Sequence, residues 1–371
     1  MRLAITVPWG ERLGGAETML WTLLRNIRQT PVEPTVIFFQ PGPYAEEVAA
    51  LGVETVVVRA GRLRQPVSFA WTVTRLARVL RGRRCDLLLD WAPKTHLYGG
   101  PAATLAGLRG RTVWWQHGVP ERGWMDRAAT ALPALAVGCS SAAGAQAQLR
   151  LKPGLRTFVV HPGIDAPPQA SSAELAALRK ELGLPGEGLV LGVVGRLQPW
   201  KRQHLLIKAV AELRRRGRKV HGLIVGGDAY GLSPEYAQAL PELARRLGVE
   251  DHVTFTGQVD DAGRFLQLMD VVLSTSRSEP FGIVIVEAMA LARPVVAFAS
   301  AGPLEIVQPG VTGLLLPEGG GSAVLTGAVE RLMDDPDLRL RLGQAARRRF
   351  LERFTADRMT RSLTRQLEAM V

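Results

Sequence analysis

A chain of 371 residues is too long for a single ordinary hydrophobic core, so two domains of similar size are expected. Its hydrophobic content of 47% is that of a globular protein, and neither a membrane-spanning run nor a signal peptide is predicted. The two cysteines, Cys85 and Cys139, lie outside any C-x-x-C pair, which excludes a disulfide framework and a zinc site. A cytoplasmic protein is therefore expected.

The formal net charge of +12 is concentrated in the first half of the chain, where residues 1–170 carry 20 basic and 11 acidic side chains. The basic residues are densest between Arg59 and Arg84. A helix there would carry an apolar face of Trp71, Val73, Leu76 and Leu80 beside Arg75 and Arg78. That face could lie on anionic lipid, which predicts a peripheral protein on the inner face of the membrane. Alternatively, it could pack on its own sheet and leave the arginines in solvent.

Short apolar runs alternate with stretches long enough for helices, which is typical of parallel sheets with helical crossovers. In the first half these runs are RLAITVPW, PTVIFFQ, ETVVV, DLLLDW, RTVWWQ, ALAVGCS and RTFVVHPG. The turn-rich segment HPGIDAPPQASS follows, and Ser171 with Glu174 makes a capping box after it. The second half contains GLVLGVVG, VHGLIVGG, HVTFTG, VVLSTS and PVVAFA before the closing helices. The predicted fold class is α/β, with doubly wound domains over residues 1–168 and 169–354.

Open parallel sheets bind ligands at the carboxyl ends of their strands, so the loops there carry the functional argument. After the first strand, Gly14 and Gly15 let backbone amides approach an anion, with the positive end of a helix behind them. A plain tight turn is the alternative for such a loop. His117 follows another strand, in WWQHGVP, and could bond a sugar hydroxyl or move a proton. A lone histidine is more often a structural hydrogen bonder.

In the second half, Gly195 ends a strand, and Arg196 and Lys201 flank the loop before the next helix. Two permanent cations at a strand end suit a diphosphate, whose charge a helix terminus neutralises only in part. Solvated surface charge would explain either residue singly. Their joint placement after a glycine-ended strand favours phosphate.

The stretch SEPFGIVIVEAMA places Glu279 on a loop and Glu287 two turns into a helix. The amides of Phe281, Gly282 and Ile283 are predicted to begin that helix and can donate to phosphate or sugar oxygens. Carboxylates beside a diphosphate would repel it. We therefore expect the two glutamates to accept hydrogen bonds from hydroxyl groups of a sugar and a ribose.

The motifs GGAE, GRLQPWKRQHLLIKAV, SEPFGIVIVEAMA and AGPLEIV together resemble the retaining glycosyltransferases of family 4, over nearly the whole chain. The resemblance implies the GT-B fold, in which two Rossmann-like domains face a central cleft. The N-terminal domain would take the acceptor side and the C-terminal domain the nucleotide-sugar side. A closing helix over residues 355–371 would pack back on the first domain.

By that resemblance, Arg196 and Lys201 hold the donor diphosphate, Glu287 the ribose hydroxyls, and Glu279 the transferred sugar. Gly15 approaches the phosphates from the other domain, and His117 contacts the sugar near the reacting centre. The strand ends expected near the base are Gly227 with Asp228, and Gly257 to Val259. One departure is Arg202, which follows Lys201 where the family frequently has glycine. This residue either changes the backbone of the loop or adds a cation.

The implied reaction moves a sugar from a nucleotide sugar to a hydroxyl acceptor with retention, in cell-surface polysaccharide, glycolipid or other glycoconjugate synthesis. The acceptor would be a sugar, a lipid-linked sugar or a small molecule. Fixed cations at the leaving diphosphate can replace a metal ion. The only Asp-x-Asp, formed by Asp335 and Asp337, is interpreted as a turn between closing helices, so neither a metal nor another cofactor is expected.

Other functions remain open from the sequence. The charge suggests a nucleic-acid binder, but the basic residues are not interleaved with aromatic ones and no nucleic-acid module is recognisable, so no nucleic-acid partner is expected. A catalytically inactive or sugar-nucleotide-binding GT-B protein is a second alternative. The joint presence of His117, Arg196, Lys201 and Glu279 argues against it. A sugar-nucleotide epimerase shares the architecture and would differ in its product.

Overall fold

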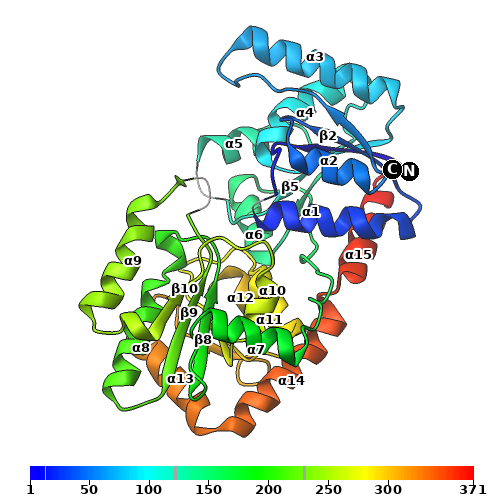
Figure 1. Cartoon of the computed structure of the whole chain (residues 1–371). Coiled ribbons are helices and arrows are strands. Elements are labelled where there is room, and N and C mark those ends of the chain that lie inside the picture. Colours follow the sequence, from blue (N-terminus) through cyan, green and yellow to red (C-terminus); the bar gives the residue numbers. More distant parts are fainter. Residues whose placement is uncertain (13, 121–122, 229–230) are drawn as a thin grey trace. The chain divides into compact units, whose positions relative to one another are not determined.

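The structure is a computed structural model and describes residues 1–12, 14–120, 123–228 and 231–371 (Figure 1). The chain divides into two compact units. Unit 1 consists of Met1–Gly163 and Ala356–Val371, and unit 2 of Ile164–Thr355. The division expected from the sequence, between residues 168 and 169, lies a few residues further along the same connecting segment.

Unit 1 is built on a seven-stranded parallel sheet with the order β3-β2-β1-β4-β5-β6-β7. Its strands are β1 (Arg2–Val7), β2 (Glu33–Phe38), β3 (Glu54–Val57), β4 (Leu87–Asp90), β5 (Thr112–Gln116), β6 (Ala136–Cys139) and β7 (Thr157–Val159). All seven fall on the apolar runs that predicted strands. The order reverses between β1 and β4, and crevices at such a reversal are where open parallel sheets bind ligands.

The helices that connect these strands are α1 (Gly15–Asn26), α2 (Pro43–Ala50), α3 (Pro66–Gly82), α4 (Pro93–Ala106), α5 (Trp124–Ala131) and α6 (Ala142–Leu151). Helices α1 and α2 cover one face of the sheet, where β1 contributes Leu3 and Ile5 to the core. Helices α3 and α4 cover the other face, where β1 contributes Ala4. The last helix, α15 (Ala356–Glu368), belongs to this unit because Met359 and Leu363 are buried in the core beside α1. Unit 1 is therefore doubly wound, as predicted.

Unit 2 repeats this plan with a six-stranded parallel sheet in the order β10-β9-β8-β11-β12-β13. The strands are β8 (Leu189–Val194), β9 (Val220–Val225), β10 (Val253–Phe255), β11 (Val271–Ser274), β12 (Val295–Phe298) and β13 (Leu314–Leu316). The sequence predicts the first five and misses β13. This strand is three residues long and lies between turns, so it carries too short a pattern.

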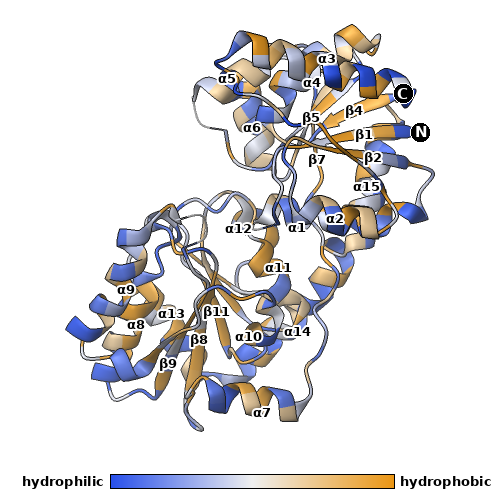
Figure 2. Ribbon diagram, turned by 45° about the horizontal axis from the view of Figure 1, so that its top comes forward, coloured by the Kyte–Doolittle hydropathy of each residue, from blue (hydrophilic) through white to orange (hydrophobic). Residues whose placement is uncertain are grey.

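The main helices of unit 2 are α7 (Ser172–Glu181), α8 (His204–Arg215), α9 (Pro234–Arg246), α10 (Ala262–Leu266), α11 (Ile283–Ala290), α12 (Ala301–Ile306), α13 (Ser322–Asp334) and α14 (Pro336–Arg353). Helices α8, α9 and α13 cover one face of the sheet, and α10, α11 and α14 the other. The predicted capping box opens α7: the Ser171 hydroxyl accepts from the Glu174 amide at 3.2 Å. Because helices cover both faces of each sheet, the strands are apolar along their length while the helices are apolar on one side (Figure 2).

Helix α3 buries three of the four side chains that were predicted to form its apolar face. Val73, Leu76 and Leu80 are buried against the sheet of unit 1. Trp71 is 48% exposed, and Arg75 stacks on its ring at 4.6 Å. The apolar face therefore packs on its own sheet, and the predicted place of Trp71 on it is wrong. None of the helices in the described ranges combines the length and apolar character that a membrane crossing requires.

Candidate functional site

The main cluster of functional side chains in unit 2 lies at the carboxyl ends of β8 and β11. These strands are neighbours at the point where the sheet order reverses. The loop after β8 runs from Gly195 to Gln203, and the loop after β11 runs from Thr275 to Gly282. Because parallel neighbours end at the same edge, the topology brings together residues 78 positions apart in the sequence.

The loop after β8 is shaped by a glycine and a buried amide. Gly195 has a φ of +144°, which glycine adopts without strain, and a Cβ there would lie 3.7 Å from Cε of Lys201. Buried Gln203 donates from Nε2 to the Arg196 carbonyl at 2.8 Å. The Arg196 side chain is half-buried, and no carboxylate among the described residues pairs with its guanidinium. Arg196 therefore lies at the strand end as a cation without a carboxylate partner in the described part of the chain.

Lys201 and Glu279 form an ion pair across the two loops. The Lys201 Nζ atom lies 2.7 Å from Oε2 of Glu279, and the two side chains are only 17% and 11% exposed. The same oxygen accepts from the Ser276 hydroxyl at 2.7 Å, and Nζ lies 4.3 Å from the centre of the Trp200 ring. These contacts offset part of the cost of removing the two charges from water. The ammonium group carries three donors, so it can also serve a phosphate oxygen.

The backbones of the two loops are joined as well. The Arg277 amide donates to the Trp200 carbonyl at 2.8 Å, and the Thr275 hydroxyl donates to the Lys201 carbonyl at 2.6 Å. The backbone beside Lys201 is therefore tied to the loop that carries Glu279. Donors fixed in this way need little rearrangement when charge develops on a bound group.

Helix α11 begins at Ile283, two residues later than predicted. Gly282 precedes it with a φ of +108°, which is outside helical geometry, and Phe281 is buried in the core of unit 2. The Glu279 amide donates to the Ser300 hydroxyl at 3.3 Å. This hydrogen bond connects the loop to the residue that precedes α12. The first turn of α11 still leaves backbone amides without partners inside the helix, as any helix start does.

Glu287 lies in the second turn of α11, where it is half-buried. No hydrogen-bond or ion-pair partner holds its carboxylate among the residues the structure describes. Burial, helped by the nearby Asp261 carboxylate, raises the pKa of Glu287 to about 7. A carboxylate in this position gains from a hydroxyl that donates to it, which suits a ribose.

The residues expected near a base lie where β9 and β10 end. The Gly226 amide donates to the Gly257 carbonyl at 3.0 Å, and a Cβ on Gly227 would lie 3.1 Å from the Gln258 nitrogen. These two strand ends are therefore in direct contact, with Val259 packed on the core beside them. The Asp228 carboxylate accepts from the Ser233 amide at 2.9 Å and so caps its own loop.

Arg202 settles the alternatives raised by its place after Lys201. It has a φ of +55°, in the left-handed region that glycine favours, so the backbone keeps a glycine-like conformation. Its guanidinium lies 4.9 Å from the centre of the Phe298 ring and donates to the Gly320 carbonyl at 2.5 Å. The added cation thus contacts the last residue of β12 and the loop after β13.

In unit 1, the predicted glycine turn opens α1. Gly14 precedes the helix in an extended conformation, and Gly15 is its exposed first residue. A Cβ on Gly14 would lie 2.8 Å from Oε2 of the buried Glu17, so this position has little room for a side chain. No side chain among the described residues caps the helix, and its first amides can therefore receive an anion.

His117 follows β5 and lies among tryptophans. Its ring centre is 5.1 Å from that of Trp91, 6.4 Å from that of Trp115 and 6.5 Å from that of Trp9. Nε2 lies 2.8 Å from the Trp91 carbonyl, which can only accept, so Nε2 carries a proton. Burial lowers the pKa of His117 to about 4, which keeps the ring neutral at pH 7. Nδ1 then carries no proton and can accept a hydrogen bond from a sugar hydroxyl.

The structure adds residues that the sequence analysis did not assign. Ser276 and Thr275 hold the Lys201–Glu279 pair, Gln203 holds Arg196, and Trp91 holds His117. The polar run STSRSE directly after a buried strand is a signal that could have identified the first two. Nothing in the sequence around Gln203 or Trp91 distinguishes them from core residues.

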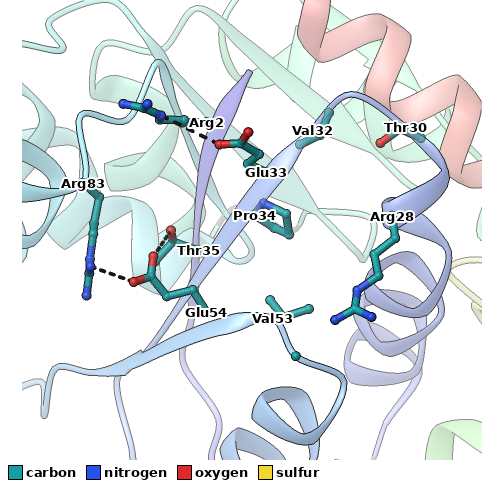
Figure 3. Close-up of a pocket in the computed structure, with 11 residues that line it drawn as sticks. Arg2, Arg28, Thr30, Val32, Glu33, Pro34, Thr35, Val53, Glu54 and Arg83 are labelled. Carbon is teal, nitrogen blue, oxygen red and sulfur yellow. Dashed lines mark hydrogen bonds and ion pairs between the residues drawn. The ribbon is translucent and has the colours of Figure 1, made fainter.

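A pocket of about 480 Å³ in unit 1 lies away from these loops (Figure 3). It is lined by the first residues of β1, β2 and β3, so it opens at the amino edge of the sheet. Two of its arginines are paired: Arg83 lies 2.7 Å from Glu54, and Arg2 lies 3.8 Å from Glu33. Neither its position nor its charge matches the predicted site.

Of the Asp335–Asp337 pair, Asp335 lies between the two closing helices, as predicted, whereas Asp337 lies in the first turn of α14. Helix α13 ends at Asp334 and α14 begins at Pro336, and the Asp335 carboxylate accepts from the Leu338 amide at 2.7 Å. Asp335 therefore caps α14. In the described part of the chain, His, Cys, Asp and Glu side chains form no group of three that could hold a metal ion.

Two family models match this chain, one over each half. The family of glycosyl transferases group 1 matches residues 176–349, and glycosyltransferase family 4 matches residues 13–166. The chain belongs to the group 1, family 4 glycosyltransferases. Two relatives of the chain are named D-inositol 3-phosphate glycosyltransferases. That of Kribbella flavida is 38% identical over 194 residues, which are 51% of this chain and 45% of the relative. That of Nocardia farcinica is 41% identical over 197 residues, 52% of this chain and 43% of the relative. The matches thus span about half the length of these relatives.

The likeness to solved structures covers the whole length of the chain. HepE of Anabaena in complex with UDP has a TM-score of 0.86 and 26% identity, over 100% of both chains. The same protein with UDP-glucose has a TM-score of 0.84 and 27% identity, again over 100% of both chains. A glycosyltransferase of Rickettsia africae has a TM-score of 0.87 at 18% identity, over 100% of this chain and 98% of the other, which bears on the fold alone. The fold of the chain is GT-B, as predicted.

The raised pKa of Glu287 predicts a pH-dependent cost. At a pH below 4.5, the ordinary pKa of a glutamate, the carboxyl is protonated in both the folded and the unfolded chain. It then takes nothing from the free energy of unfolding. Between 4.5 and about 7 only the unfolded chain ionises, and above 7 the full cost is present, at most about 3 kcal/mol. Glu287→Gln should therefore gain stability over the native chain from pH 4 to pH 8 in urea unfolding. Exposed Glu318→Gln is the control and should show no such trend. A constant difference for Glu287→Gln would contradict the prediction.

Proposed function

We propose that the chain is a retaining glycosyltransferase that moves a sugar from a nucleoside diphosphate sugar to a hydroxyl acceptor. One observation carries the proposal: the Lys201–Glu279 ion pair lies at the carboxyl edge of β8 and β11, where the order of the unit 2 sheet reverses, and Arg196 follows β8 at the same edge. Two cations and a carboxylate at one sheet edge match a donor that combines a diphosphate with sugar hydroxyls. Family membership supports the same activity.

The donor we propose is a UDP-sugar. The support comes from HepE, whose complexes with UDP and UDP-glucose match this chain over its full length. In this proposal Arg196 and Lys201 bind the diphosphate, Glu287 accepts from ribose hydroxyls, and Glu279 accepts from the sugar. Nδ1 of His117 accepts a hydrogen bond from a hydroxyl group of the sugar.

The reaction follows from where charge develops. The bond between the anomeric carbon and the β-phosphate oxygen breaks, and the acceptor oxygen bonds to the same face of that carbon. A phosphate oxygen takes the proton of the acceptor hydroxyl, so no side-chain nucleophile is needed. The leaving UDP gains negative charge, which Arg196 and Lys201 stabilise more strongly than the charge of the intact donor.

The acceptor we propose is anionic or lies at an anionic membrane surface. Residues 55–85 contain eight arginines and neither aspartate nor glutamate, and all eight are exposed. Exposed Val67 and Trp71 lie on α3 among them. The relatives from Kribbella flavida and Nocardia farcinica are named for D-inositol 3-phosphate, which carries a phosphate group. An anionic acceptor agrees with these names. A lipid-linked sugar would combine both features.

Lys201→Ala should lower turnover about a hundredfold, because losing one fixed donor at a developing charge costs roughly 3 kcal/mol. The measurement is transfer from UDP-glucose together with thermal stabilisation by UDP. Lys208→Ala, the same change at an exposed position on α8, is the control and should behave like the native chain. Near-native turnover of Lys201→Ala would remove Lys201 from the site. A native chain that UDP does not stabilise would refute the UDP donor, and a new free sugar nucleotide as product would indicate an epimerase.

Turnover should be unchanged in excess chelator, because two permanently placed cations already face the leaving group. The assay compares initial rates before and after dialysis against EDTA. A loss of activity that magnesium or manganese restores would show that the reaction uses a metal ion.

Vesicles that contain anionic lipid should bind the chain at low salt and release it at high salt, because each basic side chain near such a surface contributes about 1 kcal/mol. Co-sedimentation with anionic and neutral vesicles measures this. Replacing three exposed arginines by glutamate should abolish binding to these vesicles. The three, none of which has a described side-chain partner, are Arg62, Arg64 and Arg78.

The control for that experiment replaces three exposed arginines of unit 2 by glutamate, which changes the net charge by the same amount. These are Arg246, Arg331 and Arg348. This variant should still bind, because its substitutions lie outside the arginine-rich segment 55–85. Equal loss in both variants would reduce the effect to net charge, and negligible binding of the native chain would leave a freely dissolved acceptor.

A further inference from the structure

Trp91 occupies a particular place in unit 1, directly after β4. In the sheet, β4 lies between β1 and β5. The loop after β1 leads to Gly14, Gly15 and α1, and the loop after β5 begins with His117. The residue that follows the strand between them is therefore the one that can touch both loops.

Trp91 makes both contacts with well-defined geometry. Its indole Nε1 donates to the carbonyl of Ala16, in the first turn of α1, at 3.0 Å. Its own carbonyl accepts from Nε2 of His117 at 2.8 Å. The side chain is fully buried, and its ring stacks on that of Trp115 with centres 5.5 Å apart and an angle of 18°.

The backbone at Trp91 is itself held. Its amide donates to the Thr6 carbonyl at 3.0 Å. Next to it, the buried Asp90 carboxylate accepts from the Thr6 hydroxyl at 2.6 Å and lies 2.9 Å from Nδ1 of the buried His96. Gly99 makes room for this group, because a Cβ there would lie 2.1 Å from Oδ1 of Asp90. The end of β4 is thus tied to β1 and to α4.

We infer that Trp91 is a positioning residue that sets the glycine turn before α1 and the His117 ring from one fixed point. Its indole holds the first turn of α1, and its carbonyl selects the His117 tautomer that leaves Nδ1 as acceptor. The inference rests on the proposed function for its effect on turnover. Its structural content, that two loops depend on one tryptophan, stands independently.

The test compares two substitutions in one aromatic stack. Trp91→Phe removes the Nε1 bond to Ala16 and keeps the backbone carbonyl. Trp115→Phe is the matched control: Trp115 is equally buried, and its Nε1 donates to the Ser140 hydroxyl at 2.9 Å. If Trp91 served only to fill the core, both variants would lose similar stability and similar activity.

Three measurements are made on the native chain and both variants: UDP-glucose turnover, UDP affinity, and amide hydrogen exchange over residues 14–20. Trp91→Phe should turn over at least tenfold more slowly than Trp115→Phe, with UDP affinity within twofold in both. Exchange in the first turn of α1 should become at least tenfold faster in Trp91→Phe only. Equal turnover of the two variants, or unchanged exchange in Trp91→Phe, would overturn the inference.

A second measurement uses the native chain and holds even if Trp91→Phe does not fold. The ¹⁵N shifts of the imidazoles, with His117 assigned by His117→Gln, should show His117 neutral and protonated at Nε2 at pH 7. Protonation at Nδ1, or a charged ring, would overturn the role of the Trp91 carbonyl. If the native chain transfers no sugar, the proposed function fails, while exchange and tautomer still decide whether Trp91 positions the two loops.

Discussion

The junction between the loops after β8 and β11 is the contact on which the proposed chemistry depends. One ion pair, Lys201 to Glu279, and two backbone bonds beside it hold these loops together. A pair that is mostly removed from water survives only when further hydrogen bonds compensate its charges. Ser276 supplies one of them. The junction thus places a cation and a carboxylate side by side, where a phosphate and a sugar hydroxyl need opposite partners.

The two units use one topology for different chemistry. Both sheets reverse their strand order between the first strand and the fourth of the unit, and candidate residues lie at or beside that reversal in both. In unit 2 the loops there carry cations and carboxylates. In unit 1 the loop after β1 carries a glycine turn, and the loop after β5, one strand beyond the reversal, carries a neutral histidine among tryptophans. Backbone amides and a neutral ring recognise a ligand by hydrogen bonds, without adding a further fixed charge.

Electrostatics in this chain is divided between buried and exposed groups, which differ in strength. The +12 charge arises mostly from exposed arginines of unit 1, whose interactions salt screens. The charges at the junction of unit 2 are few but largely shielded from water, so screening affects them less. Surface attachment and catalysis should therefore respond differently to ionic strength.

The sequence by itself determined the features that depend on neighbours along the chain. Periodic apolar runs located all seven strands of unit 1 and five of the six in unit 2, and the Ser171 capping box marked the start of α7. The glycines and cations at strand ends identified the candidate site, since parallel topology fixes where strand ends lie.

Only the tertiary structure decided which side chains meet. The sequence could not pair Lys201 with Glu279, because 78 residues and several elements separate them. It placed Trp71 on one apolar face with Val73, Leu76 and Leu80, whereas in the structure the other three are buried and Trp71 is exposed. Trp91 looked like an ordinary core residue, because its two hydrogen bonds join loops that follow different strands. Such contacts depend on strand order, and no local pattern records it.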